Sequence, residues 1–201
     1  MDTKTLEIIK NYSIKEYSKS VDKFHDLKHI ERVVKNASWI VRKLKMEDLI
    51  DINLLNASCY LHDILIANRN AKNNFSQLYN NLIERSLNRK YMMKILDFFD
   101  LDTKEKQILS VAIINHPNSI PFRILNRQGD LYTKILQDAD SLDYISLNRQ
   151  QNLIEEKGKL LNQIANKYIF WIRKNIKKYL NFPELAFRLN GGLISAEDFE
   201  F

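Results

Sequence analysis

Two histidines lie four residues apart where a helix is expected to begin, so both would share one helical face. They are His25 and His29 in FHDLKHIERVVKNASWI, residues 24–40, and Arg32 follows one turn later. The chain contains only 4 histidines. An imidazole can bind a metal ion, whereas a guanidinium keeps its proton and suits a phosphate better. The stretch therefore raises the question of a metal or phosphate site.

A second pair of chemically active side chains, His62 and Asp63, lies inside the most apolar segment of the chain, INLLNASCYLHDILI at residues 52–66. An ionised carboxylate is costly in such surroundings unless a cation or several donors neutralise it. Cys59, three residues earlier, is interpreted as a buried core residue because nothing near it in the sequence would stabilise a thiolate.

A third group consists of aspartates in LQDADSLDYI, residues 136–145. Carboxylates this close raise one another's pKa unless a metal ion or a base lies among them. Asp138 and Asp140 are about 200° apart around a helix, so only one of them can point directly at an ion. Two imidazoles and two carboxylates from three helices would make a divalent-metal site, formed by His29, His62, Asp63 and one aspartate of this group.

Four stretches in this order and spacing resemble the HD-domain metal-dependent phosphohydrolases, and most closely a small bacterial branch of them. The stretches are HDLKHIERV at residues 25–33, ASCYLHDI at 57–64, INHP at 114–117 and QDADSLDYI at 137–145. The resemblance implies an all-α fold, an HD-domain helical bundle. Carried over position by position, it makes the metal ligands His29, His62, Asp63 and Asp140.

The resemblance also suggests roles for neighbouring side chains. Asp140 is preferred to Asp138 because Ala139–Leu142 matches the frame of the wider family, and Asp138 stays an alternative. Asp143, one turn further, would orient a ligand. Phosphate or substrate contacts are expected from His25, Lys28 and Arg32, and the catalytic residues would be Asp63, Arg32 and His116, the last as proton donor or phosphate contact.

The expected function is metal-dependent hydrolysis of a phosphoester or phosphoanhydride in a nucleotide or another small phosphorylated molecule. Because few histidines remain, one divalent ion is favoured over the dinuclear centres of multi-histidine HD enzymes, and this also argues against oxidative di-iron chemistry. Mn, Fe, Co, Ni, Zn or Mg would suit the ligands. The alternative is an HD-fold regulatory module that binds metal or nucleotide with little or no turnover.

Composition sets the remaining expectations. A net charge of +6 favours anionic partners, but the basic stretch WIRKNIKKYL, residues 171–180, is interpreted as a solvated helix face rather than a nucleic-acid site. One cysteine and no apolar leader predict a cytoplasmic protein. No apolar run is long enough to span a membrane. A homodimer is left open.

The chain is expected to form one helical domain, because 4 glycines and 3 prolines in 201 residues leave few hairpin turns. The core motifs lie in residues 24–145, followed by a C-terminal helix and an irregular tail in residues 150–201. Apolar periodicity predicts helices over residues 3–18, 27–45, 52–66, 76–88, 90–99, 103–115, 129–147 and 150–180.

Overall fold

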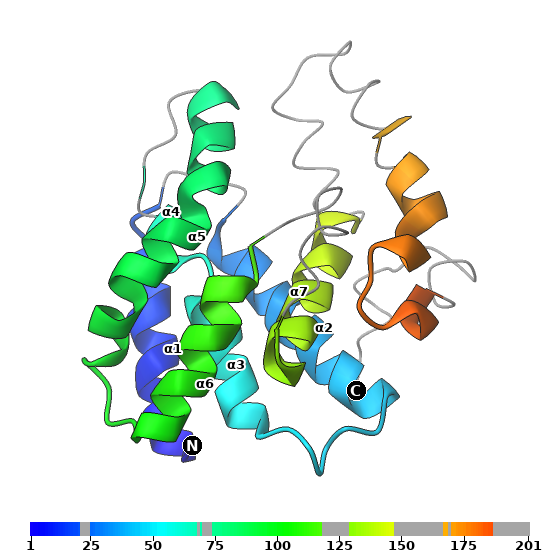
Figure 1. The fold of residues 1–201 in the computed structure, drawn as a ribbon. Helices are drawn as coiled ribbons and strands as arrows, with labels where there is room; N and C mark the ends of the chain where they lie inside the picture. The colour runs from blue at the N-terminus through cyan, green and yellow to red at the C-terminus, as the bar shows by residue number, and fades with distance from the viewer. Residues whose placement is uncertain are drawn as a thin grey trace.

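The computed structural model describes residues 1–20, 25–67, 69, 74–117, 129–146, 167–168 and 170–186, with the side chains of 74–79, 81 and 82 excepted. Within these ranges every regular element is a helix, so the predicted all-α fold is confirmed (Figure 1). The α-helices are α1 Thr3–Tyr17, α2 Leu27–Lys43, α3 Ile52–Leu61, α4 Ile64–Ala67, α5 Asn74–Leu96, α6 Thr103–Asn115 and α7 Leu131–Tyr144. Two 3₁₀ helices follow, η2 Ile176–Lys178 and η3 Pro183–Ala186.

Aspartate residues determine where five of these helices begin. In each case the carboxylate accepts a hydrogen bond from a backbone N–H of the first turn, which has no partner inside the helix. The five N-cap residues, at the starts of α1, α2, α3, α6 and α7, are Asp2, Asp26, Asp51, Asp102 and Asp130. Each cap stabilises its helix by about 1 kcal/mol.

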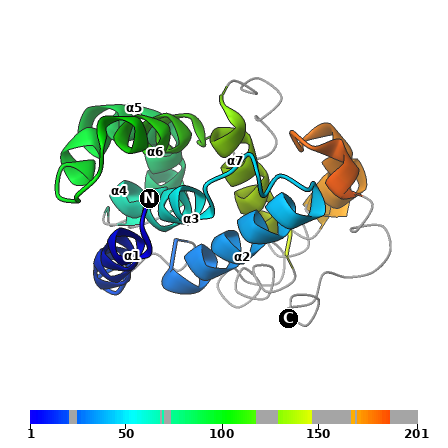
Figure 2. The same ribbon diagram turned by 90° about the horizontal axis from the view of Figure 1, so that it is seen from below.

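Helix α3 occupies the centre of the bundle (Figure 2) and packs against α1, α2, α6 and α7. One apolar cluster joins α2, α3 and α7 to residues 172–186, and a second joins α3 to α1, α4, α5 and α6. Because α3 contributes to both clusters, its C-terminal end is held in the middle of the molecule. His62 and Asp63 follow directly at that end.

The structure corrects three of the predicted helices. The segment 52–66 is interrupted at His62 and Asp63, where α3 ends and the short helix α4 starts. Residues 76–88 and 90–99 belong to one helix, α5, because Arg89 offers no break and the backbone continues to Leu96.

Most of the helix predicted over 150–180 lies outside the described residues; the chain is helical at 167–168 and 170–175 and continues into η2. The end of the molecule after Ala186 lies outside them as well. The extent of the domain stays a prediction. None of the described helices combines the length and apolarity that a membrane crossing requires.

Candidate metal centre

His29 lies on the first turn of α2, where the Asp26 cap also fixes its backbone: the His29 N–H donates to Asp26 Oδ1 over 2.7 Å. The side chain is buried. Its Nδ1 lies 2.7 Å from Asp143 Oδ2, and its Nε2 faces the other way, 3.2 Å from Asp63 Oδ2. The ring therefore spans the space between α7 and the end of α3.

His62 and Asp63 occupy the junction between α3 and α4. His62 Nδ1 donates to the carbonyl of Cys59 over 2.8 Å, which fixes the ring against the last turn of α3. The Asp63 carbonyl accepts from Ile66 and Ala67 and so starts α4. His62 Nε2 is buried and has no hydrogen-bond partner among the described residues. Asp63 Oδ2 is 3.1 Å away, but the two atoms are not aligned for a hydrogen bond.

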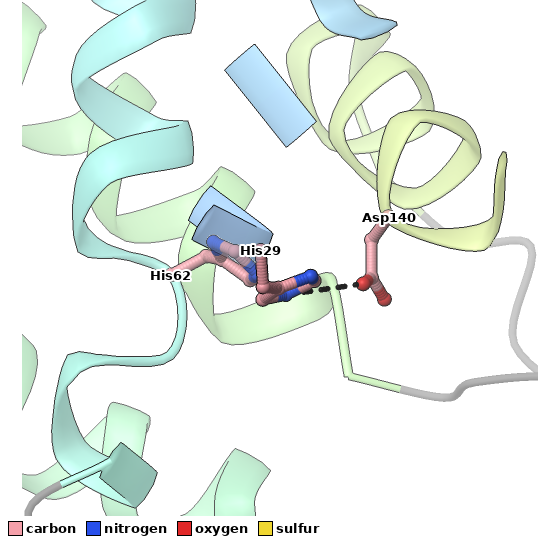
Figure 3. Close-up of side chains that lie close together, drawn as sticks. All are labelled: His29, His62 and Asp140. Atoms are coloured by element: carbon pink, nitrogen blue, oxygen red, sulfur yellow. Dashed lines mark ion pairs between the residues drawn. The ribbon is translucent and has the colours of Figure 1, made fainter. Parts of the chain in front are cut away.

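Helix α7 brings Asp140 to this pair from the opposite side. Asp140 Oδ1 lies 3.6 Å from His29 Nε2 (Figure 3). Asp138 has turned away, since its two carboxylate oxygens accept from the backbone N–H groups of Asn181 and Phe182, each over 2.9 Å. The structure thus places Asp140 at the site and gives Asp138 a different task, holding the segment before η3 against α7.

All 4 histidines of the chain gather around Asp63. His116, the C-cap residue of α6, places Nε2 at 3.4 Å from Asp63 Oδ1. His25 Nε2 is 3.8 Å from Asp63 Oδ2 and its side chain is 12% exposed, which makes it the histidine nearest to solvent. Four imidazoles from three segments of the chain therefore surround one buried carboxylate.

The charged groups of this cluster shift the pKa values of one another. Burial by itself would raise the pKa of Asp63, but the imidazoles of His62, His25, His116 and His29 outweigh it and hold the pKa well below its usual range. Burial would lower the pKa of His116, but the carboxylates of Glu84 and Asp63 raise it well above the usual value. The fully buried hydroxyl of Tyr17 has a pKa raised by desolvation and by the nearby Asp63 charge.

The ring tautomers show that the cluster fits a metal ion. His62 Nδ1 lies against the carbonyl oxygen of Cys59, and His116 Nδ1 lies against that of Ile113. Because a carbonyl oxygen only accepts hydrogen bonds, each Nδ1 carries a proton. The carboxylate of Asp143 assigns the same tautomer to His29. In His29 and His62 the Nε2 lone pair is left facing Asp63, which is the arrangement that metal-binding histidines adopt. In His116 the Nε2 faces the carboxylates of Glu84 and Asp63, which favour a proton on that nitrogen as well.

Among the described residues, two overlapping sets of donor atoms could hold an ion, and the atoms of each set lie within 4.8 Å of one another. The sets are His29, His62 and Asp140, and His62, Asp63 and His116. The first set joined to Asp63 is the ligand group that the sequence suggests. The second set shows that His116 faces the same centre, so the count of histidines does not by itself limit the site to one ion. The number of ions stays a prediction.

The phosphate contacts expected from the sequence are only partly brought together. Arg32 donates to Asp143 through Nε and through Nη2, the latter over 3.3 Å. Its guanidinium thus supports the carboxylate that orients His29. Lys28 is exposed on the first turn of α2, and among the described residues it is not one of the cations within 4 Å of Asp63.

Sequence reasoning missed Glu84. This glutamate of α5 is buried, and Oε1 lies 3.0 Å from His116 Nε2. Burial raises the pKa of its carboxyl. The signal in the sequence was a stripe of Asn80, Glu84 and Asn88 at four-residue spacing, which places three polar side chains on one face of a helix. All three are buried.

Comparison with known proteins identifies the family. The model of the HD domain family matches residues 26–145, a range that begins beside His29 and ends beyond Asp143. The chain belongs to the HD domain family. The crystal structure of a predicted HD superfamily hydrolase from an uncultured Thermotogales bacterium superposes with a TM-score of 0.51 and 22% identity, over 88% of this chain and 90% of that one. Among curated proteins, none matches this chain.

Proposed function

We propose that this HD-domain protein is a metal-dependent phosphohydrolase that cleaves a phosphoester or phosphoanhydride bond in a nucleotide or another small phosphorylated molecule. The observation that supports it best is the buried Nε2 of His62, which has no hydrogen-bond partner in the described part of the chain and faces the Asp63 carboxylate beside the Nε2 of His29. A buried polar atom without a partner is costly, and a bound cation would remove that cost.

The residues proposed to hold one divalent ion are His29, His62, Asp63 and Asp140. Bound there, the ion would acidify a water molecule and polarise a phosphate oxygen. Arg32, His25 and Lys28 are proposed to bind the phosphate group. His116 would donate a proton or a hydrogen bond on the side of Asp63 that faces α6, where its Nε2 lies 3.4 Å from Asp63 Oδ1.

The alternative is an HD-fold module that binds metal or nucleotide without turnover. The engagement of Arg32 favours it, because a guanidinium already paired with Asp143 has fewer donors left for a phosphate. In that case the protein would bind metal through the same ligands, and hydrolysis of a bound nucleotide would be slow or absent.

Elemental analysis of the purified protein followed by a phosphate-release assay separates these functions. The wild type is compared with a His62→Ala, Asp63→Ala double variant and with Asp138→Asn, a matched control on α7. Nucleotides and generic phosphoesters are supplied with Mn, Co, Ni or Mg.

We expect metal in the wild type and in the control and none in the double variant, with phosphate released only by the first two. Metal without phosphate release from any substrate would support the module. Equal metal in all three proteins would refute the site, provided that circular dichroism shows all three folded.

A further inference from the structure

We propose that helix α5 positions His116 for its role at the metal centre, with Glu84 as the main positioning residue and Asn88 as its helper. The effect on catalysis rests on the proposed function, whereas the positioning of the His116 ring rests on the geometry alone. Glu84 and Asn88 lie one turn apart on α5, and both are buried. Neither belongs to the group proposed to bind the ion.

On one side of the ring, α5 and His116 share an acceptor. The carbonyl oxygen of Ile113 accepts from His116 Nδ1 over 2.7 Å and from Asn88 Nδ2 over 3.2 Å. This carbonyl belongs to the last turn of α6, where the C-terminal C=O groups lack helical partners. Asn88 therefore holds in place the same oxygen that determines the tautomer of His116.

On the other side, Glu84 faces the nitrogen that points at the site. His116 Nε2 lies 3.0 Å from Glu84 Oε1 and 3.4 Å from Asp63 Oδ1. Glu84 Oε1 is buried and has no aligned hydrogen bond in the described structure. Since a buried carboxylate oxygen is costly unless something offsets it, its position beside an imidazole nitrogen indicates that it acts on that ring.

Together the two contacts limit rotation of the imidazole. Turning the ring about its Cβ–Cγ bond would separate Nδ1 from the Ile113 carbonyl and Nε2 from both carboxylates. Helix α5 packs along α6, so the clamp is built on two rigid elements rather than on a loop. We infer that α5 keeps His116 aimed at the Asp63 side of the reaction centre.

The kinetic test compares Glu84→Gln with Glu84→Ala on a substrate found in the release assay. Gln keeps an oxygen acceptor of the same reach, so we expect kcat to stay within about 3-fold of the wild type. Ala removes the contact, and we expect kcat to fall by roughly 10- to 100-fold with KM nearly unchanged and bound metal unaltered. Equal losses in both variants, or loss of metal in either, would overturn a positioning role.

A spectroscopic test works whether or not phosphate is released. In Zn²⁺-loaded protein labelled with ¹⁵N-histidine, the His116 ring signals are identified by their disappearance in His116→Gln. We expect a single set of His116 ring signals with a protonated Nδ1 in the wild type, and shifted or broadened His116 signals in Glu84→Ala and Asn88→Ala. The matched control is Asn80→Ala, one turn away on α5, where Asn80 accepts a hydrogen bond from Arg69 instead.

The outcomes of the two tests are independent. Unchanged His116 signals in Glu84→Ala would overturn the inference even in an active enzyme. Altered signals in a protein that releases no phosphate would leave the positioning role standing and refute the proposed function alone.

Discussion

Asp143 orients the His29 ring through its Nδ1 atom. Its carboxylate accepts from His29 Nδ1 over 2.7 Å and is itself held by Arg32. Removing such an acceptor usually lowers metal affinity about 10- to 100-fold, because the ligand loses its fixed tautomer. We therefore expect Asp143→Ala to weaken Mn²⁺ or Zn²⁺ binding by this factor in a chelator-competition titration. Unchanged affinity in a folded variant would show that Asp143 does not support metal binding through His29.

Replacing Asp140 or Asp138 of α7 by asparagine should affect metal binding in one case and stability in the other. Asp140 points to His29, so Asp140→Asn is expected to lose metal with little loss of stability. Asp138 binds the backbone of Asn181 and Phe182. Asp138→Asn is expected to keep the metal and lose about 1–3 kcal/mol of unfolding free energy.

Metal analysis and urea denaturation of both α7 variants, side by side, make this comparison. Loss of metal from the Asp138 variant alone would reverse the assignment of the two residues.

At the scale of the elements, the cap of α2 supports the site as well as the helix. Asp26 accepts from the backbone N–H of His29, so it determines where the first turn places that ring. We expect Asp26→Ala to lower the free energy of unfolding by about 1 kcal/mol and Asp26→Asn to have a much smaller effect. Urea denaturation measures both. Equal losses would mean that the charge of Asp26, rather than the cap, supports α2.

The C-terminal end of α2 carries a lysine in a backbone conformation that glycine would adopt with less strain. Lys45 adopts a φ of 53°. The Lys45 N–H donates a hydrogen bond to the Arg42 carbonyl and the Met46 N–H donates one to the Val41 carbonyl, which together form a Schellman motif. Glycine occupies this left-handed position without the Cβ strain that other residues bear, so Lys45→Gly should stabilise the protein by about 1 kcal/mol.

Lys43→Gly, inside the last turn of the same helix, is the control and should destabilise it by a similar amount. A loss of stability in Lys45→Gly, measured as a lower thermal midpoint, would contradict the expectation.

At the scale of the whole molecule, periodicity predicted where most helices lie because each buries one apolar stripe. It failed at residues 62–63, where the apolar run continues through Ile66 while the backbone breaks. That break depends on the His62 ring bonding to Cys59 and on Asp63 starting a new turn, which are contacts of the folded chain. No pattern of apolar residues records them.

The sequence predicts those donor residues of the site that belong to the family motifs. His29, His62, Asp63 and Asp140 meet as the motifs suggest. Glu84 could not be found in this way, because a glutamate in the middle of a polar-rich helix looks solvated until α6 is packed against it. The packing of α5 against the next helix, α6, decides which face of α5 is buried, and the sequence of α5 alone does not contain those contacts.

Cys59 reports on the stability of the molecule as a whole. It is fully buried in the cluster that joins α2, α3 and α7 to the C-terminal segment, and burial raises the pKa of its thiol. We expect a thiol reagent to modify native protein at pH 8 only through unfolding, so that the rate rises with urea as the folded fraction falls.

Divalent metal at 100 times its dissociation constant stabilises a folded protein by about 2.7 kcal/mol, so it should slow modification of Cys59 roughly 100-fold. In the His62→Ala, Asp63→Ala variant the same metal should leave the rate unchanged. Fast labelling without urea, insensitive to metal, would instead show that the end of α3 opens locally, and then the metal centre could not rest on a rigid core.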